Sequence, residues 1–228
     1  MAIRSDDPTR APSSAAWDLI TTHGIRDILD LRSHNELARL GRAATYELPV
    51  RHHHLPMRLG DGRLRNGTLP PLPATPEELG RFYARTVEQS ALPLRFALEV
   101  IADSQSSVLF HCVAGKDRAG LLAAVLLSAV GVERRAIIED YVRTEQNLPR
   151  LRASVLGPDA GVAGATGVAT IDSLPGVMWE APAEALEVCL ATLVERHGSV
   201  VAPLHLSGLS TDVLRRLGLR FVEGTTLP

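Results

Sequence analysis

The segment that most constrains the fold is SVLFHCVAGKDRAGLLAAVLLSAVGV, residues 107–132, in which two apolar runs flank a short polar loop. The first run is short and rich in β-branched and aromatic residues, so it predicts a buried strand that ends near His111 and Cys112. The second run, from about Gly120, is typical of a buried helix. Burial does not explain a lysine, an aspartate and an arginine between these runs. The loop therefore indicates a site between a strand and a helix.

Strands and helices alternate along the rest of the chain, which predicts an α/β fold. A central, mainly parallel sheet is expected to be flanked by helices, with further helices at the C-terminal end. Thr75 and Glu78 form a capping box with Pro76 at the first helical position, so a helix begins there. Strands are expected at residues 26–33 and 45–50, a loop at 51–73, and helices at 15–24, 75–90, 92–103, 133–148, 182–198 and 210–219.

The composition predicts one globular domain over residues 1–228. The hydrophobic content of 45% in 228 residues is enough for one sizeable core. Residues 157–176 are rich in glycine and alanine and have no helical periodicity, so they predict either an ordered insert or a flap. We found no internal repeat that would suggest a second domain.

The charge and the cysteines exclude several classes of protein. A net charge of −2 gives no reason to expect binding to nucleic acid, and no apolar run is long enough for stable insertion in a membrane. The two cysteines, Cys112 and Cys189, lack the paired spacing of a disulfide framework; Cys189 is expected to be a small packed residue. The N-terminus has no apolar core of the kind a secretory signal needs. We therefore expect a cytoplasmic protein.

The polar loop has the properties of a phosphate site. Its amides can turn inward, and the N-terminus of the following helix adds partial positive charge. Gly115 permits a tight backbone, and Arg118 supplies a planar fork that matches two phosphate oxygens. The same field favours a thiolate at Cys112, which can attack phosphorus in line. The residues expected to bind phosphate are Val113, Ala114, Gly115, Lys116 and Arg118.

The motif HCVAGKDRAG, residues 111–120, resembles the active-site loop of the cysteine-dependent tyrosine phosphatases, in particular the atypical bacterial branch with the pattern HCxAGKDRTG. The segments GIRDILDLRSHNEL, HHHLPM and GVERRAIIEDYVRTEQNL follow in the order of that family. The resemblance implies a metal- and cofactor-independent phosphomonoester hydrolase of protein-tyrosine or dual-specificity type. Cys112 would form a cysteinyl-phosphate, Arg118 would stabilise the transition state, and Asp117 would be the acid, with Asp61 as the alternative acid.

Two departures from the family pattern leave a second function open. Family members usually have a further segment before Arg4 and Ser5, and they have a hydroxyl residue at the position of Ala119. Alanine cannot donate a hydrogen bond to the departing sulfur. The alternative is therefore a phosphate-binding module of the same fold with impaired turnover.

The expected partners are a phosphorylated protein or a phosphoinositide. Lys116 adds a second cation to the loop, as in the lipid-active relatives, and is predicted to meet an additional phosphate on an inositol ring. The sequence makes no prediction about the oligomeric state. Other enzyme classes fit less well: a Walker loop needs Gly-Lys-Ser/Thr, sulfur transferases have a shorter loop, and arsenate reductases have extra redox cysteines.

Residues outside the loop are expected to support it. His111 is predicted to organise the loop through hydrogen bonds to backbone carbonyls. Asp30, Arg32 and Glu36 are predicted to form a structural charge network near the pocket. Histidines 52–54 cannot all bind one metal ion, because consecutive residues of a strand point to opposite faces. No metal site is therefore predicted.

Overall fold

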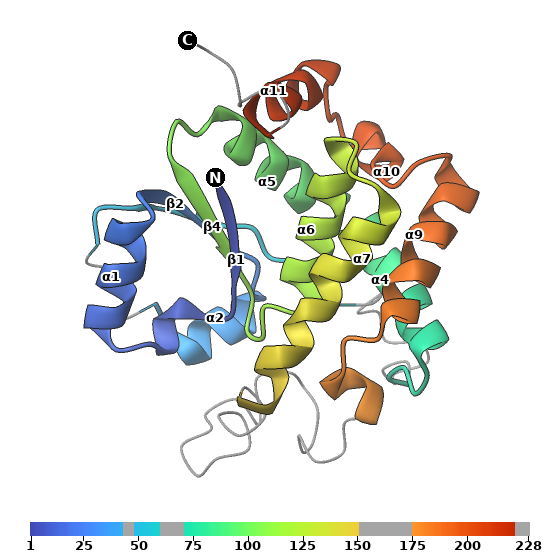
Figure 1. Ribbon diagram of the computed structural model, residues 1–228, viewed down its shortest axis with the longest axis horizontal. Helices are drawn as coiled ribbons and strands as arrows, with labels where there is room; N and C mark the ends of the chain where they lie inside the picture. The colour runs from blue at the N-terminus through green and yellow to red at the C-terminus, as the bar shows by residue number, and fades with distance from the viewer. Residues whose placement is uncertain (43–47, 60–70, 151–174, 222–228) are drawn as a thin grey trace.

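The computed structural model describes residues 1–42, 48–59, 71–150 and 175–221. At its centre lies a sheet of four parallel strands in the order β1-β4-β2-β3 (Figure 1). The strands are β1 (Ala2–Ser5), β2 (Ile25–Asp30), β3 (Arg51–His54) and β4 (Ser107–His111). β4 lies inside the sheet between β1 and β2. The loop after its carboxyl end is therefore at the edge where ligands bind in parallel α/β folds.

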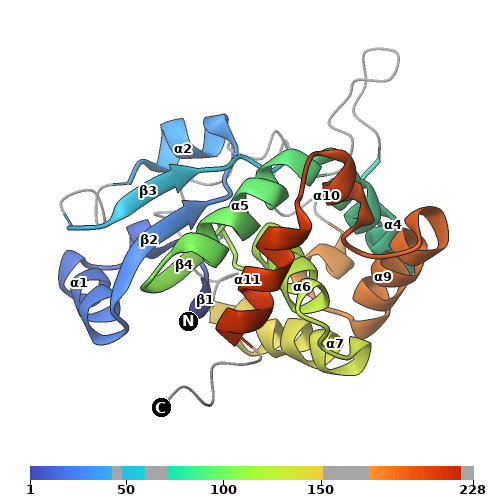
Figure 2. The same ribbon diagram turned by 90° about the horizontal axis from the view of Figure 1, so that it is seen from above.

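Helices cover the two faces of this sheet unequally (Figures 1 and 2). α1 (Ser13–Thr22) packs on one face, whereas the helices of the second half of the chain gather on the other. The remaining helices are α2 (His34–Leu40), α4 (Pro76–Gln89), α5 (Ala91–Asp103), α6 (Asp117–Ala129), α7 (Arg134–Val142), α9 (Ala183–His197), α10 (Ala202–Leu206) and α11 (Thr211–Phe221). Short 3-10 helices are η1 (Pro8–Arg10), η2 (Arg143–Asn147) and η4 (Gly176–Trp179).

The alternation of side chains along the strands divides the apolar residues into two clusters. Ile28 of β2 and Leu109 of β4 join Ile20 of α1 in a small cluster on one face. Their neighbours Leu29 and Phe110 face the larger cluster, which the helices after residue 75 complete. The site-bearing loop after β4 therefore begins from a strand that is buried on both faces.

The prediction of an α/β fold with a mainly parallel sheet and C-terminal helices is confirmed. α1, α4, α5, α9 and α11 form close to where the sequence predicts them. Thr75 Oγ1 caps α4 by accepting a hydrogen bond from the Glu78 amide at 3.2 Å. The Glu78 side chain accepts from the Ala74 amide at 2.8 Å, so it does not complete the predicted box on Thr75.

One strand was predicted in the wrong place. We expected it at residues 45–50 and a loop from 51, but β3 is Arg51–His54 and residues 48–50 are not a strand; residues 43–47 lie outside the described part. β3 is polar because its partner is the buried Asp27. Arg51 Nε and Nη2 each donate to Asp27 at 2.7 Å, and His53 Nε2 lies 2.9 Å from Asp27 Oδ1. Contacts with Asp27 thus hold this strand in the sheet, although its sequence lacks the apolar pattern that is typical of a strand.

Three further boundaries differ from the expectations. α6 begins at Asp117, three residues before the predicted start at Gly120, so Asp117 and Arg118 lie in its first turn. The helix expected at 133–148 is divided into α7 and η2, and the sequence did not predict α2 or α10.

The proposed insert at 157–176 lies almost wholly outside the described residues, and only its end, at Gly176, begins η4. No described helix is long and apolar enough to cross a membrane.

Candidate active site

The loop between β4 and α6 holds Cys112 in a buried position, 1% exposed. Gly115 in this loop adopts a φ of +67°, a conformation that favours glycine. A Cβ at this position would lie 2.7 Å from the carbonyl oxygen of Ser5. The Asp7 amide donates to the Val113 carbonyl at 3.2 Å. The segment after β1 therefore packs directly against the loop and fixes its path.

The N-terminus of α6 follows this loop without a side-chain cap. Lys116 is the N-cap residue, and its side chain accepts no hydrogen bond from the first amides of the helix. Amides at a helix N-terminus need an acceptor, and an anion is a favourable one. The loop residues predicted to bind phosphate thus lie together at the start of α6, as the sequence predicted.

Arg118, in the first turn of α6, is held by Glu36. Its Nη1 and Nη2 donate to the two oxygens of Glu36 at 2.5 and 2.7 Å. Burial alone would raise the pKa of Glu36, but the bonds from Arg118 lower it below its usual value. Arg118 Nε is buried and has no hydrogen-bond partner among the described residues. One donor of the guanidinium therefore stays available to a ligand.

Cys112 also affects the pKa of the Arg118 guanidinium. Burial opposes the charged form of Arg118, but Glu36 and then the negative charge of Cys112 outweigh it, so the pKa of Arg118 is raised. This effect requires the sulfur and the guanidinium to lie close together. The spacing Cys-x5-Arg thus brings the Cys112 sulfur close to the Arg118 guanidinium, and the role of Cys112 as nucleophile stays a prediction.

Glu36 is positioned by its own helix. Ser33 caps α2 by accepting a hydrogen bond from the Glu36 amide at 3.2 Å, and Glu36 Oε2 accepts from the Ser33 amide at 2.7 Å. This capping box holds the carboxylate at the N-terminus of α2, in the position where it binds Arg118. Glu36 was predicted to belong to a charge network, but its role as the partner of Arg118 was not predicted.

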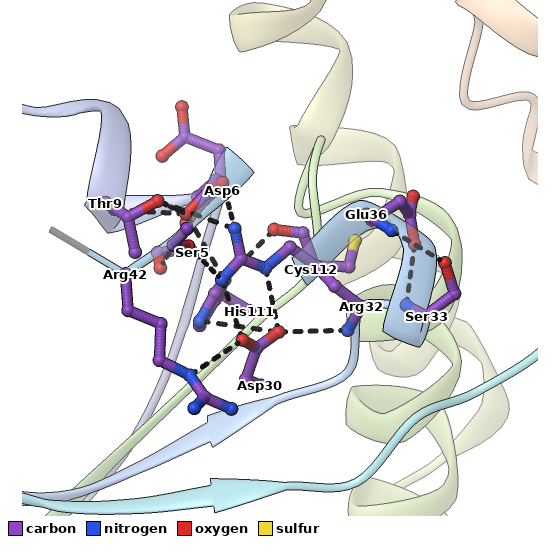
Figure 3. A network of polar contacts seen from close by, with 12 residues as sticks. Ser5, Asp6, Thr9, Asp30, Arg32, Ser33, Glu36, Arg42, His111 and Cys112 are labelled. Carbon is purple, nitrogen blue, oxygen red and sulfur yellow. Dashed lines mark hydrogen bonds and ion pairs between the residues drawn. The ribbon is translucent and has the colours of Figure 1, made fainter. Parts of the chain in front are cut away.

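His111, Asp30 and Arg32 form a buried network beside Cys112 (Figure 3). Arg32 Nε and Nη2 donate to the two oxygens of Asp30 at 2.9 and 2.7 Å, and Nη1 donates to Asp7 Oδ2 at 2.8 Å. Burial alone would raise the pKa of Asp30, but the bonds from Arg32 and the charge of His111 lower it to about 2. The predicted charge network of Asp30 and Arg32 is therefore present, with Asp7 as a member that the sequence did not predict.

His111 has the contact that was predicted for it. Its Nδ1 lies 3.0 Å from the carbonyl oxygen of Cys112, so the imidazole donates to the first peptide of the loop. Burial lowers the pKa of His111, although the charges of Asp30 and Asp7 oppose this. The imidazole in this place fixes the loop backbone through that hydrogen bond.

Asp117 and Lys116 contact residues of α4 and η4. The Tyr83 hydroxyl of α4 donates to Asp117 Oδ1, and the Lys116 ammonium lies 3.4 Å from the same oxygen. Lys116 Nζ also donates to the carbonyl of Met178 in η4 at 2.9 Å. The protein thus supplies Lys116 with acceptors of its own, and the contact with a second phosphate stays a prediction.

The remaining predicted residues fall into three groups. Ala119 is fully buried at the start of α6 and has no hydroxyl to offer the loop. Asp61, the alternative acid, lies outside the described residues. His54 Nε2 lies 2.8 Å from the Arg32 carbonyl, whereas His53 contacts Asp27. In the part of the chain that the structure describes, no three His, Cys, Asp or Glu side chains form a metal-binding group.

Sequence reasoning missed two contributors, Asp7 and Tyr83. Asp7 had a usable signal, because aspartate before Pro8 is typical of a helix start, and its Oδ1 accepts from the Thr9 amide at 3.0 Å. Tyr83 had none, since an aromatic residue on the apolar face of an amphipathic helix indicates only burial. Its hydroxyl partner, Asp117, lies 34 residues further along the chain.

The sequence matches the tyrosine phosphatase family over residues 1–223. The chain belongs to this family. It is 35% identical to triple specificity protein phosphatase PtpB of Mycobacterium tuberculosis over 121 residues, which are 48% of this chain and 42% of that protein. It is 32% identical over 173 residues, 73% of this chain and 61% of the relative, to a Cupriavidus necator protein named as a candidate tyrosine-protein phosphatase.

A Nostoc commune protein named tyrosine-protein phosphatase is 39% identical over 67 residues, 29% of this chain and 23% of that protein. The matched regions thus span less than two thirds of these relatives' own lengths. The tyrosine phosphatase family predicted from residues 111–120 is confirmed.

Proposed function

We propose that this chain hydrolyses phosphomonoesters through a cysteinyl-phosphate on Cys112. The observation that carries the proposal is the buried Arg118, whose Nη groups are bound by Glu36 while Nε has no partner among the described residues. An unpaired buried donor is costly unless a ligand satisfies it. A phosphoryl group at the uncapped N-terminus of α6 would accept from this donor and from the amides of the loop.

Each step of the proposed reaction uses groups of this loop. The Cys112 thiolate attacks phosphorus, the bond to the leaving oxygen breaks, and that oxygen takes the proton of Asp117. Water then attacks the cysteinyl-phosphate, Asp117 takes the proton of the water, and the sulfur departs as a thiolate. Arg118 and the loop amides stabilise the equatorial oxygens in both transition states.

Turnover of p-nitrophenyl phosphate in buffer with EDTA tests the proposal. We expect steady turnover by the wild-type chain and none by Cys112→Ser, because a serine hydroxyl in the same place is a far weaker nucleophile at neutral pH. The serine variant should still bind phosphate, which isothermal titration would detect. Activity retained by Cys112→Ser would refute the covalent step.

The second candidate is a phosphate-binding module without turnover, which the buried Ala119 favours. Phosphate binding by the wild-type chain without hydrolysis of any aryl phosphate would support it. The same assay therefore distinguishes the two candidates.

The proposed substrate is a phosphorylated protein that carries phosphotyrosine, or a phosphoinositide. The mycobacterial relative is named for triple specificity, and Lys116 adds a cation near the start of α6. Lys116→Ala should reduce the hydrolysis of phosphoinositides more than that of a phosphotyrosine peptide. An equal loss on both substrates would instead assign Lys116 to holding η4, through its bond to the Met178 carbonyl at 2.9 Å.

A further inference from the structure

Two buried tyrosines connect the core of the protein to Asp117. Tyr83 of α4 and Tyr141 of α7 are both fully buried within the large apolar cluster. Their hydroxyl oxygens lie 3.0 Å apart, and their rings meet edge to face with centroids 6.1 Å apart. The Tyr83 hydroxyl also contacts Asp117 Oδ1. Three helices thus bring two phenols and one carboxylate into a single chain of hydrogen bonds.

The direction of these hydrogen bonds follows from the number of protons. Burial raises the pKa of both Tyr83 and Tyr141, and the charge of Asp117 raises each further, so both phenols stay neutral. Each phenol has one proton, and an ionised carboxylate can only accept. Tyr83 therefore donates to Asp117, and Tyr141 donates to Tyr83.

This arrangement distinguishes the two oxygens of Asp117. Oδ1 accepts from Tyr83 and lies 3.4 Å from the Lys116 ammonium. The Asp117 side chain keeps 15% of its surface exposed. A proton on Oδ1 would compete with two donors, so the transferable proton is favoured on Oδ2.

We propose that Tyr83, supported by Tyr141, is a positioning residue for the reaction. Its hydroxyl holds Asp117 Oδ1, orients Oδ2 with its proton towards the leaving oxygen, and stabilises the carboxylate once the proton has left. This inference rests on the proposed function and on the role of Asp117 as the acid. Tyr83 does not touch the substrate and acts only through Asp117.

The residues around Tyr83 and Tyr141 leave room for the two phenol rings. A Cβ on Gly120, one turn after Asp117, would lie 3.1 Å from the Tyr141 ring, so glycine makes room for that ring. Arg4 of β1 and Cys189 of α9 are the other titratable groups near Tyr141, and Lys116 and Arg118 are those near Asp117. Tyr141 contacts the Tyr83 hydroxyl, and Lys116 lies 3.4 Å from the Asp117 oxygen that this hydroxyl binds.

The test compares Tyr83→Phe with the wild type on two substrates. Phenyl phosphate has a poor leaving group and needs the acid, whereas p-nitrophenyl phosphate needs it much less. We expect kcat/KM for phenyl phosphate to fall about tenfold, as the loss of one hydrogen bond to a charged group would give. The value for p-nitrophenyl phosphate should change less than twofold, roughly.

The pH profile gives a second readout. The acid must hold its proton, so kcat/KM falls as Asp117 ionises at high pH. Removing a donor destabilises the ionised carboxylate, so the alkaline limb for Tyr83→Phe should move up by about one pH unit. Tyr141→Phe is the matched control: it keeps the bond to Asp117 and should shift the limb in the same direction by less. It also serves as the test variant if Tyr83→Phe does not fold.

The double variant with Asp117→Asn decides the question. If Tyr83 acts through Asp117, Tyr83→Phe has no further effect on phenyl phosphate in the Asp117→Asn background. Equal losses on both substrates, an unmoved alkaline limb, or full additivity with Asp117→Asn would overturn the proposal and leave Tyr83 a core residue. Absence of turnover in the wild type would refute the proposed function itself, which is a different outcome.

Discussion

Two buried arginines near the carboxyl end of the sheet, Arg32 and Arg118, use their donors differently. Arg32 donates from Nε, Nη1 and Nη2 to acceptors within the fold: Asp30, Asp7, Thr9 Oγ1 and the Gly41 carbonyl. Arg118 donates to Glu36 through its two Nη groups, and its Nε has no partner among the described residues. Both side chains are shielded from water.

This difference distinguishes a structural arginine from a candidate phosphate-binding arginine. Every guanidinium nitrogen of Arg32 donates to an acceptor within the fold. Arg32 can therefore stabilise the loop, but it has no unused nitrogen to bind a substrate. Arg118 is oriented by one carboxylate and retains a donor beside Cys112. A buried donor without a partner is unfavourable, so a ligand that accepts from Arg118 Nε would remove that cost. The unused Nε is the feature in which Arg118 differs from Arg32.

The largest effect expected is that of Arg118→Lys on activity. Lysine retains the charge opposite Glu36 but cannot bind both carboxylate oxygens and present a third donor in a fixed plane. We expect kcat/KM for p-nitrophenyl phosphate to fall roughly 10³-fold. The urea unfolding midpoint should fall less than in Arg32→Lys, because Ser33 still donates to Glu36. A loss smaller than tenfold would mean that the guanidinium geometry is not used in the reaction.

The matched change at the other arginine, Arg32→Lys, should act on stability instead. The ammonium cannot replace three donors, so oxygens of Asp7 and Asp30 lose partners in a buried place. We expect the free energy of unfolding to fall by about 3 kcal/mol, measured by urea denaturation. Where the variant is folded, kcat/KM should stay within a few-fold of the wild type. If activity falls as far as in Arg118→Lys, the proposed separation of roles is wrong.

A smaller effect is expected from acid on the Arg32 cluster. The pKa of Asp30 is lowered to about 2 in the folded protein, from an ordinary value of 3.8. A lowered pKa stabilises the fold above the ordinary value, and this contribution is lost as the pH falls towards 2. It amounts to about 2 kcal/mol. Denaturation curves between pH 2 and 5 should show it, and Asp30→Asn should flatten this dependence, whereas Asp212→Asn on the exposed face of α11 should not.

The smallest expected effect concerns Ala119, the neighbour of Arg118. A hydroxyl there would donate to the sulfur as it departs, and alanine supplies none. We expect a burst of product followed by a slower steady state, and Ala119→Thr should speed the steady state about tenfold. Ala119→Val has the same shape without the hydroxyl and should not. Stopped-flow traces without a burst would show that another donor already assists the sulfur.

The parts of the fold that the sequence predicts well are those decided by local pattern. β4 and the apolar helix after it follow from residues 107–132, and Thr75 with Pro76 marks the start of α4. Ser33 and Glu36 have the same capping pattern, yet α2 was missed because the preceding strand was extended through Ser33 and the charged residues were assigned to a network. The signal for α2 was present in the sequence and was assigned to another element.

The parts that the sequence does not predict depend on partners distant along the chain. β3 is a strand because Arg51 and His53 reach Asp27 on β2, and a strand pattern does not contain that information. Cys112 and Arg118 are recognised from their own spacing. The partner of Arg118, Glu36, lies 82 residues away. The place of the loop between a strand and a helix was thus predictable, whereas the pairing of Arg118 with Glu36 was not.

The packing of Gly115 against Ser5 has a consequence for how the protein folds. The loop conformation depends on a strand at the beginning of the chain that pairs with β4, where Ala2 lies opposite Val108. Contacts between such distant segments form slowly, because a long loop must close first. The helices after residue 75 can form from local contacts alone. During refolding, we therefore expect helical circular dichroism to recover before the capacity to bind phosphate does.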